Sequence, residues 1–229
     1  MNYEENIIEF DELVDNPTTR VPICLCLDTS GSMFGDPITE LNEGVSMFYS
    51  AIKNDDTAKY AADICIATFG NGGYKLDQDF ASVENTVAPY FSADGNTPMG
   101  EAVNIALDSL EKRKSEFKNS GVDYYQPWLV LMTDGEPNGS AEELERAIQR
   151  TVEAVESKRL TIFPIGIGDD VDMNVLARFS PGRTPLRLKG LNFKQFFEWL
   201  SQSVSRTSQS SPGERIELDL DGIKGWGEL

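Results

Sequence analysis

The sequence predicts an α/β fold: a doubly wound, mostly parallel sheet with helices on both faces and an antiparallel strand at one edge. Two observations support this prediction. Four short apolar runs, 21–27, 62–69, 127–133 and 160–167, lack the polar alternation of half-exposed strands, as expected for strands covered on both faces. Amphipathic helical patterns lie between these runs. The chain has 229 residues, enough for one such domain and short for two.

Each helical pattern begins at a recognisable signal. The pair Asp36-Pro37 predicts an N-cap followed by proline at the first helical position, and Thr97-Pro98 predicts the same for a second helix. The run Ser140-Ala141-Glu142-Glu143 is a capping box for a third helix. Apolar spacing predicts a short fourth helix over 171–179 and a terminal amphipathic helix over 193–204.

Turn residues indicate the edges of the sheet. The segment 69–74 contains three glycines and predicts a turn, so the strand near 74–80 is expected to fold back antiparallel at one edge. Residues 186–188 are predicted as a last edge strand. These expectations complete a sheet whose central strands alternate with helices.

The polarity of the two ends suggests the domain boundaries. Residues 1–20 are polar and are interpreted as an N-terminal arm, and residues 21–205 as the domain. Residues 206–229 are rich in Ser, Pro, Gly and acids, and are interpreted as a polar tail or a docking strand. The docking-strand interpretation rests on three apolar residues that alternate with polar or acidic ones: Ile216, Leu218 and Leu220.

Composition excludes several classes of function. The net charge is −18, from 38 acidic and 20 basic residues, which disfavours binding to the phosphates of nucleic acids. The chain has no histidine, which removes the commonest general base, a Ser-His-Asp triad and imidazole ligands for zinc. No apolar run approaches the roughly 20 residues of a membrane span, and the acidic start differs from a secretory signal. We therefore expect a cytoplasmic protein.

Three cysteines, Cys24, Cys26 and Cys65, lie inside predicted buried strands. Cys24 and Cys26 share one face of their strand, so a zinc or redox role is one interpretation. Packing in the core is favoured, because free cysteine is among the most buried residue types.

Oxygen-bearing side chains follow two of the predicted strands. Asp28, Ser30 and Ser32 come directly after the run 21–27, and Asp134 follows the run 127–133. In doubly wound sheets these two strands lie side by side at the point where strand order reverses, and ligands bind there. Thr97 lies at the start of a predicted helix, and the loop that leads into this helix leaves the same edge of the sheet. Hydroxyl and carboxylate oxygens are ligands that hard cations such as Mg²⁺ prefer, so the sequence predicts a metal site.

These five residues match a known pattern. Asp28-x-Ser30-x-Ser32, with Thr97 and Asp134, resembles the metal-ion-dependent adhesion site of von Willebrand factor type A (VWA) domains, which implies their Rossmann-like fold over about 20–205. Four short runs are similar to those of bacterial TerY/YegL-type VWA proteins, which are linked to tellurite resistance, chemical stress or phage defence. They are residues 27–33, 35–38, 95–100 and 133–137.

The resemblance implies how the site works. Ser30, Ser32 and Thr97 would bind a divalent cation through their hydroxyls, and Asp28 and Asp134 would hold it directly or through water. The cation is expected to be Mg²⁺, with Mn²⁺ or Ca²⁺ as alternatives. An Asp or Glu from a protein partner would fill the remaining coordination position. The resemblance thus implies a metal-dependent protein–protein interaction module with no enzymatic activity.

A Mg²⁺-dependent phosphoryl-transfer enzyme with Asp28 as nucleophile is the main alternative. Such enzymes place a second carboxylate two residues on, where this chain has Ser30, so the proton donor is missing. No Lys or Arg stands beside the candidate ligands in the sequence to clamp a phosphoryl group. An extracellular adhesin, a third interpretation, would need export.

Other charged and apolar residues near the motifs receive simpler interpretations. Met33 and Phe34 are expected to form an exposed apolar pair on the rim of the site, and Glu136 to be a solvated loop carboxylate. The aromatic residues over 193–199 are expected in the core. Three further acids are expected to be surface charges: Asp63, Asp77 and Asp79.

Overall fold

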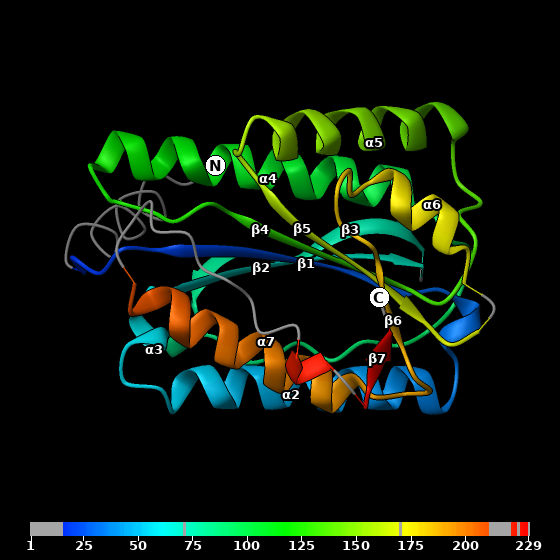
Figure 1. Cartoon of the computed structure of the whole chain (residues 1–229), viewed down its shortest axis with the longest axis horizontal. Coiled ribbons are helices and arrows are strands. Elements are labelled where there is room, and N and C mark those ends of the chain that lie inside the picture. Colours follow the sequence, from blue (N-terminus) through cyan, green and yellow to red (C-terminus); the bar gives the residue numbers. More distant parts are fainter. Residues whose placement is uncertain (1–15, 71, 170, 211–220, 224, 229) are drawn as a thin grey trace.

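The protein folds around one seven-stranded sheet with the order β3-β2-β1-β4-β5-β6-β7 (Figure 1). The computed structural model describes residues 16–70, 72–169, 171–210, 221–223 and 225–228. Five strands run parallel, and β3 and β7 pair antiparallel at the two edges. The mostly parallel, doubly wound sheet is therefore confirmed. The strands are β1 (Val21–Thr29), β2 (Ala62–Gly70), β3 (Gly73–Ser82), β4 (Trp128–Thr133), β5 (Thr161–Ile167), β6 (Leu186–Leu188) and β7 (Gly227–Glu228).

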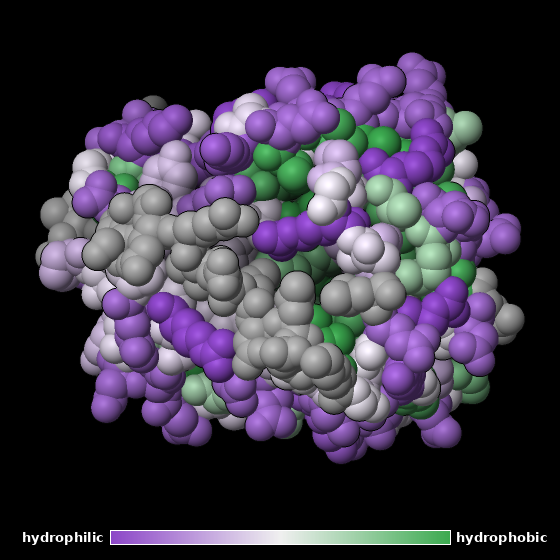
Figure 2. Space-filling model, in the orientation of Figure 1, coloured by the Kyte–Doolittle hydropathy of each residue, from purple (hydrophilic) through white to green (hydrophobic). Residues whose placement is uncertain are grey.

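Helices cover both faces of this sheet. In Figure 1, α4, α5 and α6 lie on one side, and α2, α3 and α7 lie on the other. Hydrophilic residues dominate the outward surfaces of the helices at the top and bottom of the same view (Figure 2). The α-helices are α2 (Asp36–Lys53), α3 (Ala58–Ala61), α4 (Met99–Ser120), α5 (Ala141–Glu156), α6 (Met173–Arg178) and α7 (Phe193–Ser208). Three short 3-10 helices are η1 (Gly31–Met33), η2 (Val83–Asn85) and η3 (Asp221–Ile223).

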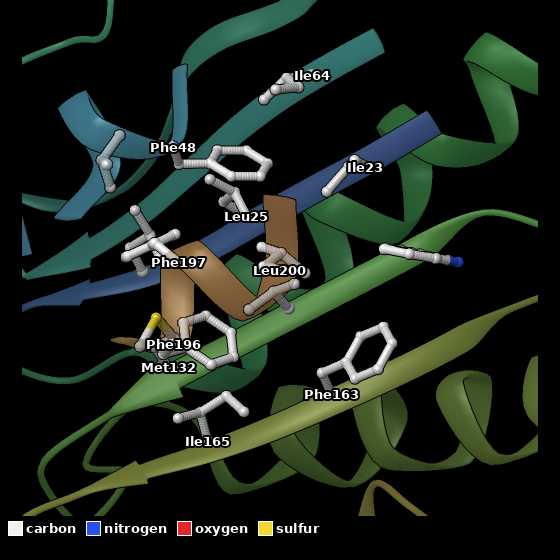
Figure 3. Close-up of a cluster of buried hydrophobic side chains, with 14 of the residues drawn as sticks. Ile23, Leu25, Phe48, Ile64, Met132, Phe163, Ile165, Phe196, Phe197 and Leu200 are labelled. Atoms are coloured by element: carbon white, nitrogen blue, oxygen red, sulfur yellow. The ribbon is translucent and has the colours of Figure 1, made fainter. Parts of the chain in front are cut away.

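Alternate residues of β1 supply two separate hydrophobic clusters. Ile23 and Leu25 face α2 and α7, where Phe48 and Phe197 join them (Figure 3). Cys24 lies on the opposite face, in the cluster shared with α4, α5 and α6. Burial on both faces explains why the sequence of β1 lacks polar alternation. The strands predicted over 21–27, 62–69, 127–133 and 160–167, and the helices between them, are confirmed.

The position of β1 in the sheet creates the expected switch point. β1 pairs in parallel with β2 on one side and with β4 on the other, and Leu27 lies opposite both Thr68 and Met132. The carboxyl ends of β1 and β4 therefore reach the same edge of the sheet. Loops that follow these two strands must begin side by side.

Two helices begin one residue away from the predicted position. The N-cap of α2 is Gly35, with φ of 93°, and Asp36 is already helical. The N-cap of α4 is Pro98, so Thr97 precedes the helix and does not cap it. Gly35 allows this turn because glycine tolerates positive φ. Thr97 is thus a loop residue, with its carbonyl accepting the Met99 N–H at 2.8 Å.

The far edge of the sheet also differs from the prediction. β6 is not the last strand, because Leu188 pairs with Gly227 of β7. A strand of two residues is too short to show a periodic pattern, so it could not be predicted from the sequence. Helix α7 continues to Ser208, beyond the expected boundary at 205. The three alternating apolar residues of the expected docking strand, Ile216, Leu218 and Leu220, lie outside the described residues.

Asp63 was expected to be a surface charge, and this expectation is wrong. Asp63 lies in β2, 3% exposed, and forms a bidentate ion pair with Arg113 of α4. The Arg113 Nε donates to one Asp63 oxygen at 2.7 Å and Nη2 to the other at 3.1 Å. Pairing with a guanidinium offsets the cost of burying the carboxylate, and the partner lies 50 residues away in sequence.

Within the described part of the chain, no helix has the length and apolar character needed to cross a bilayer.

Candidate metal centre

Asp28 lies inside the end of β1, because the strand runs two residues beyond the predicted run to Thr29. Its side chain is wholly buried and both carboxylate oxygens are hydrogen-bonded. Oδ1 accepts the Ser30 N–H at 2.8 Å, and Oδ2 accepts the Thr133 hydroxyl at 2.5 Å. Thr133 is the last residue of β4, so this bond ties the two strand ends together. Sequence reasoning missed Thr133, whose only signal was a hydroxyl directly before Asp134.

Ser30, Ser32 and Asp134 form a continuous chain of hydrogen bonds. The Ser30 and Ser32 hydroxyl oxygens are 3.1 Å apart, and the Ser32 hydroxyl donates to Asp134 Oδ1 at 2.7 Å. Because the Ser32 hydroxyl gives its one hydrogen to Asp134, its oxygen can only accept a hydrogen bond from Ser30. Ser30 is buried and Ser32 is exposed, so this oxygen cluster reaches the surface. The fold thus brings together residues that are 102 positions apart.

Thr97 is buried in a loop that runs beside the end of β1. The Asp94 N–H donates to the Thr29 carbonyl at 3.0 Å, and the Gly31 N–H donates to the Gly95 carbonyl at 3.0 Å. These bonds hold the loop against the segment that contains Ser30. Among the described residues, the Thr97 hydroxyl has no hydrogen-bond partner, whereas its backbone is fully engaged.

The electrostatics of the site favour a bound cation. Burial raises the pKa of Asp28 to about 6, although hydrogen bonds from Ser30 and Thr133 oppose the rise; the charge of Asp134 adds to it. Burial also raises the pKa of Asp134, against the hydrogen bond from Ser32. Burial and mutual repulsion therefore oppose the ionisation of Asp28 and Asp134. A divalent cation bound between them would stabilise the charged form of both carboxylates.

The donor set fits a small hard cation. With metal–oxygen distances of about 2.1 Å, adjacent ligand oxygens around Mg²⁺ lie roughly 3 Å apart. The oxygens of Ser30, Ser32 and Asp134 already have separations of 3.1 Å and 2.7 Å. In the described residues, no group of three or more His, Cys, Asp or Glu could hold a metal, so the candidate site depends on hydroxyl donors.

The rim of the site differs in part from the expectation. Phe34 is 79% exposed, as expected, but Met33 is fully buried in the core beside α2 and α7. The turn η1 separates the two residues by turning one side chain inward. Glu136 is exposed, as expected for a solvated loop carboxylate.

The three cysteines pack as core residues. Cys24, Cys26 and Cys65 are free and buried, in one hydrophobic cluster with Ala67 and Leu129. The Cys24 and Cys65 sulfur atoms are 3.4 Å apart, on paired residues of β1 and β2. Burial raises the pKa of the Cys26 thiol well above its ordinary value, which favours the neutral form. The packing interpretation is therefore supported by the geometry.

Together, the fold and the site define a doubly wound α/β domain with an oxygen-lined candidate metal centre at its switch point. The sequence model of the von Willebrand factor type A domain matches residues 23–197. The chain therefore belongs to the von Willebrand factor type A domain family. Domains of this family often mediate metal-dependent protein–protein interactions and are generally interaction modules.

Individual relatives are distant in sequence. Human inter-alpha-trypsin inhibitor heavy chain H6 is 21% identical over 180 residues, covering 78% of this chain and 14% of the human protein. The von Willebrand factor type A structure from Catenulispora acidiphila has a TM-score of 0.58 and 16% identity, covering 82% of this chain and 43% of that chain. Manganese-loaded TRAP protein from Plasmodium vivax has a TM-score of 0.50 and 19% identity, covering 76% of this chain and 69% of that chain. The chain thus spans a small part of its human relative, and the structural similarities establish a shared fold.

Proposed function

We propose that this protein is a metal-dependent protein–protein interaction module that binds an acidic residue of a partner through a divalent cation. Ser30, Ser32 and Thr97 would hold the cation through their hydroxyls, and Asp28 and Asp134 would hold it directly or through water. The observation that carries the proposal is the convergence of Ser30, Ser32 and Asp134: neighbouring oxygens lie 3.1 Å and 2.7 Å apart although Ser32 and Asp134 are 102 residues apart in sequence, close enough for one ion to contact all three.

The donor chemistry, hydroxyl and carboxylate oxygens without nitrogen or sulfur, supports a hard divalent cation: Mg²⁺, with Mn²⁺ or Ca²⁺ as alternatives. The manganese-loaded state of the Plasmodium vivax TRAP protein supports a divalent cation in this fold. Mg²⁺ is the proposed ion, since hydroxyl and carboxylate oxygens suit it well.

Charge balance supports an acidic partner residue. Two carboxylates neutralise a divalent cation and the three hydroxyls add no charge, so the ion retains affinity for one further anion. The exposed Ser32 places the oxygen cluster within reach of such a residue. Phe34, exposed on the rim, would add apolar contact area.

The cellular setting is part of the proposal. The runs 27–33, 35–38, 95–100 and 133–137 resemble those of TerY/YegL-type proteins. That resemblance supports a role in a cytoplasmic bacterial system for tellurite resistance, stress response or defence.

Phosphoryl transfer by Asp28 has less support. A nucleophilic carboxylate needs a free oxygen that can reach the substrate. Asp28 is wholly buried, and its two oxygens accept hydrogen bonds from Ser30 and Thr133. This environment suits a residue that orients the site.

The proposal is tested by measuring cation binding to Ser32→Ala and to the control Ser46→Ala. Ser32 is exposed, so its hydroxyl can be removed with little risk to folding, and Ser46 is an exposed serine of α2. At a Mn²⁺ concentration of about 100 times Kd, linkage predicts a rise in Tm of roughly 5–10 °C for a chain of this size. The parent and Ser46→Ala should show this rise, and Ser32→Ala should lose most of it. An equal rise in Ser32→Ala would place the ion elsewhere.

Partner binding is measured with the same proteins. Co-purification with neighbouring gene products should yield a complex that EDTA dissociates and Mg²⁺ restores, and that Thr97→Ala does not form. A complex that survives both EDTA and Thr97→Ala would use another surface. Hydrolysis of a generic phosphate ester that requires Asp28 would favour the enzyme alternative.

A further inference from the structure

We propose that Asn138 is a positioning residue of the metal centre: it fixes the loop of Thr97 against the loop of Asp134 before a cation binds. This inference rests on the proposed function, because it concerns the same site. It adds a residue outside the five oxygen donors, and it explains how donors from separate loops stay together in the absence of an ion.

The evidence is a pair of reciprocal hydrogen bonds between Asn138 and Thr97. The Thr97 N–H donates to Asn138 Oδ1 at 2.6 Å, and the Asn138 N–H donates to the Thr97 carbonyl at 3.1 Å. One residue therefore engages both backbone polar groups of the residue that carries the candidate hydroxyl ligand. Asn138 lies four residues after Asp134, so the contact joins two of the loops that supply ligands.

A second link, between Glu101 and Ser140, reinforces the contact. Glu101 Oε1, in the first turn of α4, accepts the N–H of Ser140, the N-cap of α5, at 2.7 Å. Gly139 lies between the two links, and a Cβ there would approach Glu101 Oε2 to 2.5 Å and the Pro98 Cα to 2.8 Å. The loops therefore approach so closely that only glycine fits between them.

The burial of the two residues indicates that Asn138 holds the backbone of Thr97 in place and is not itself a packed core residue. Asn138 is exposed, whereas Thr97 is 5% exposed, so the amide of Asn138 pairs a backbone N–H that water reaches poorly. Residues that orient metal ligands through hydrogen bonds typically change metal affinity by about 10- to 100-fold when removed. Thr97 has a free hydroxyl but an anchored backbone, which is the arrangement such a residue requires.

The test compares Asn138→Ala, Asn138→Asp and the control Asn174→Ala by Mn²⁺ titration calorimetry and by amide hydrogen exchange. Asn138→Ala should weaken Mn²⁺ binding about tenfold and should accelerate exchange of the Thr97 amide in metal-free protein. Asn138→Asp keeps the acceptor oxygen and should bind Mn²⁺ at least as tightly as the parent. Asn174 is exposed in α6, and its replacement should change neither quantity.

Each outcome has a distinct meaning. A folded Asn138→Ala with unchanged Mn²⁺ affinity, or with unchanged Thr97 exchange, would overturn the positioning role while leaving the metal centre intact. Binding by Asn138→Asp as weak as that of Asn138→Ala would also overturn it. A parent chain that binds no Mn²⁺ would overturn both this inference and the proposed function, so the two failures are distinguishable.

Discussion

Single asparagine side chains take the place of backbone pairing where the chain has no regular structure. Residues 86–98 form neither helix nor strand, yet Phe91 is buried within them. Asn42 of α2 donates to the Phe91 carbonyl at 2.9 Å and accepts its N–H at 2.7 Å, as a neighbouring strand would. Asn138 engages Thr97 through one side-chain and one backbone bond: its Oδ1 accepts the Thr97 N–H, and its own backbone N–H donates to the Thr97 carbonyl. The segment that delivers Thr97 to the site is thus held by two asparagines, because buried backbone groups must be paired.

Replacing Asn42 with Ala should lower the free energy of unfolding by about 2–4 kcal/mol, because the change leaves two buried backbone groups of Phe91 unpaired. Urea unfolding at neutral pH measures this loss. The exposed Asn174, replaced in the same way, should change it by less than about 0.5 kcal/mol. A loss for Asn42→Ala no larger than that of the control would mean that water satisfies Phe91.

At the scale of helices and strands, the buried ion pair of Asp63 and Arg113 links helix α4 to strand β2. The Arg113 side chain is 9% exposed, and its guanidinium carbon lies 5.0 Å from the centre of the Phe117 ring. Helix α4 carries the Thr97 loop at one end and this pair further along its length. The sequence predicted α4 from its apolar spacing but not this pair, because a charge pattern does not reveal which partner folding will bring to it.

Replacing Arg113 with Met should destabilise the protein by about 3–5 kcal/mol, because Asp63 would remain buried without a counter-charge. Lys112 lies on the exposed side of the same helix and bonds Asp79 at 3.1 Å. Lys112→Met should therefore cost less than about 1 kcal/mol. Denaturant unfolding measures the free energy of unfolding of both variants and shows whether Arg113→Met loses more of it than Lys112→Met.

The double variant Arg113→Met with Asp63→Leu provides a further control for this pair. It should recover much of the stability lost in Arg113→Met, since no unpaired charge remains. Failure to recover would show that packing of the guanidinium on Phe117, and not charge, accounts for the loss.

For the molecule as a whole, the net charge of −18 opposes compaction. Monovalent salt screens this repulsion, and the screening length falls from about 10 Å at 0.1 M to about 3 Å at 1 M. Exposed ion pairs are screened as well, but each contributes little. The same negative field draws divalent cations towards the protein generally, so site binding must be separated from screening.

Thermal unfolding in NaCl and in MgCl₂ at matched ionic strength makes this separation. NaCl should raise the Tm of the parent and of Ser32→Ala equally. MgCl₂ should raise the Tm of the parent further, in a saturable way, and this extra rise should be absent from Ser32→Ala. A Tm that falls with NaCl would mean that favourable ion pairs outweigh the net repulsion.

Most of the candidate metal ligands could be predicted from the sequence, but the contacts that hold them in place could not. Asp28, Ser30 and Ser32 could be named because they follow one apolar run at close spacing, and Asp134 because it follows another. Their role as metal ligands stays a prediction. The bond between Thr133 and Asp28 spans 105 residues, and the contact between Asn138 and Thr97 spans 41, so neither left a local signal.

The sequence by itself determined the longer elements and their order, because burial on both faces leaves apolar strands and the helices between them have amphipathic spacing. It did not predict the four-residue helix α3 or the two-residue strand β7. Only the tertiary structure decided which side chains meet. It buried Asp63 against Arg113, separated Met33 from Phe34, and placed β7 beyond β6. The physical reason is that pairing across long sequence separations depends on packing geometry, which no local pattern of residues encodes.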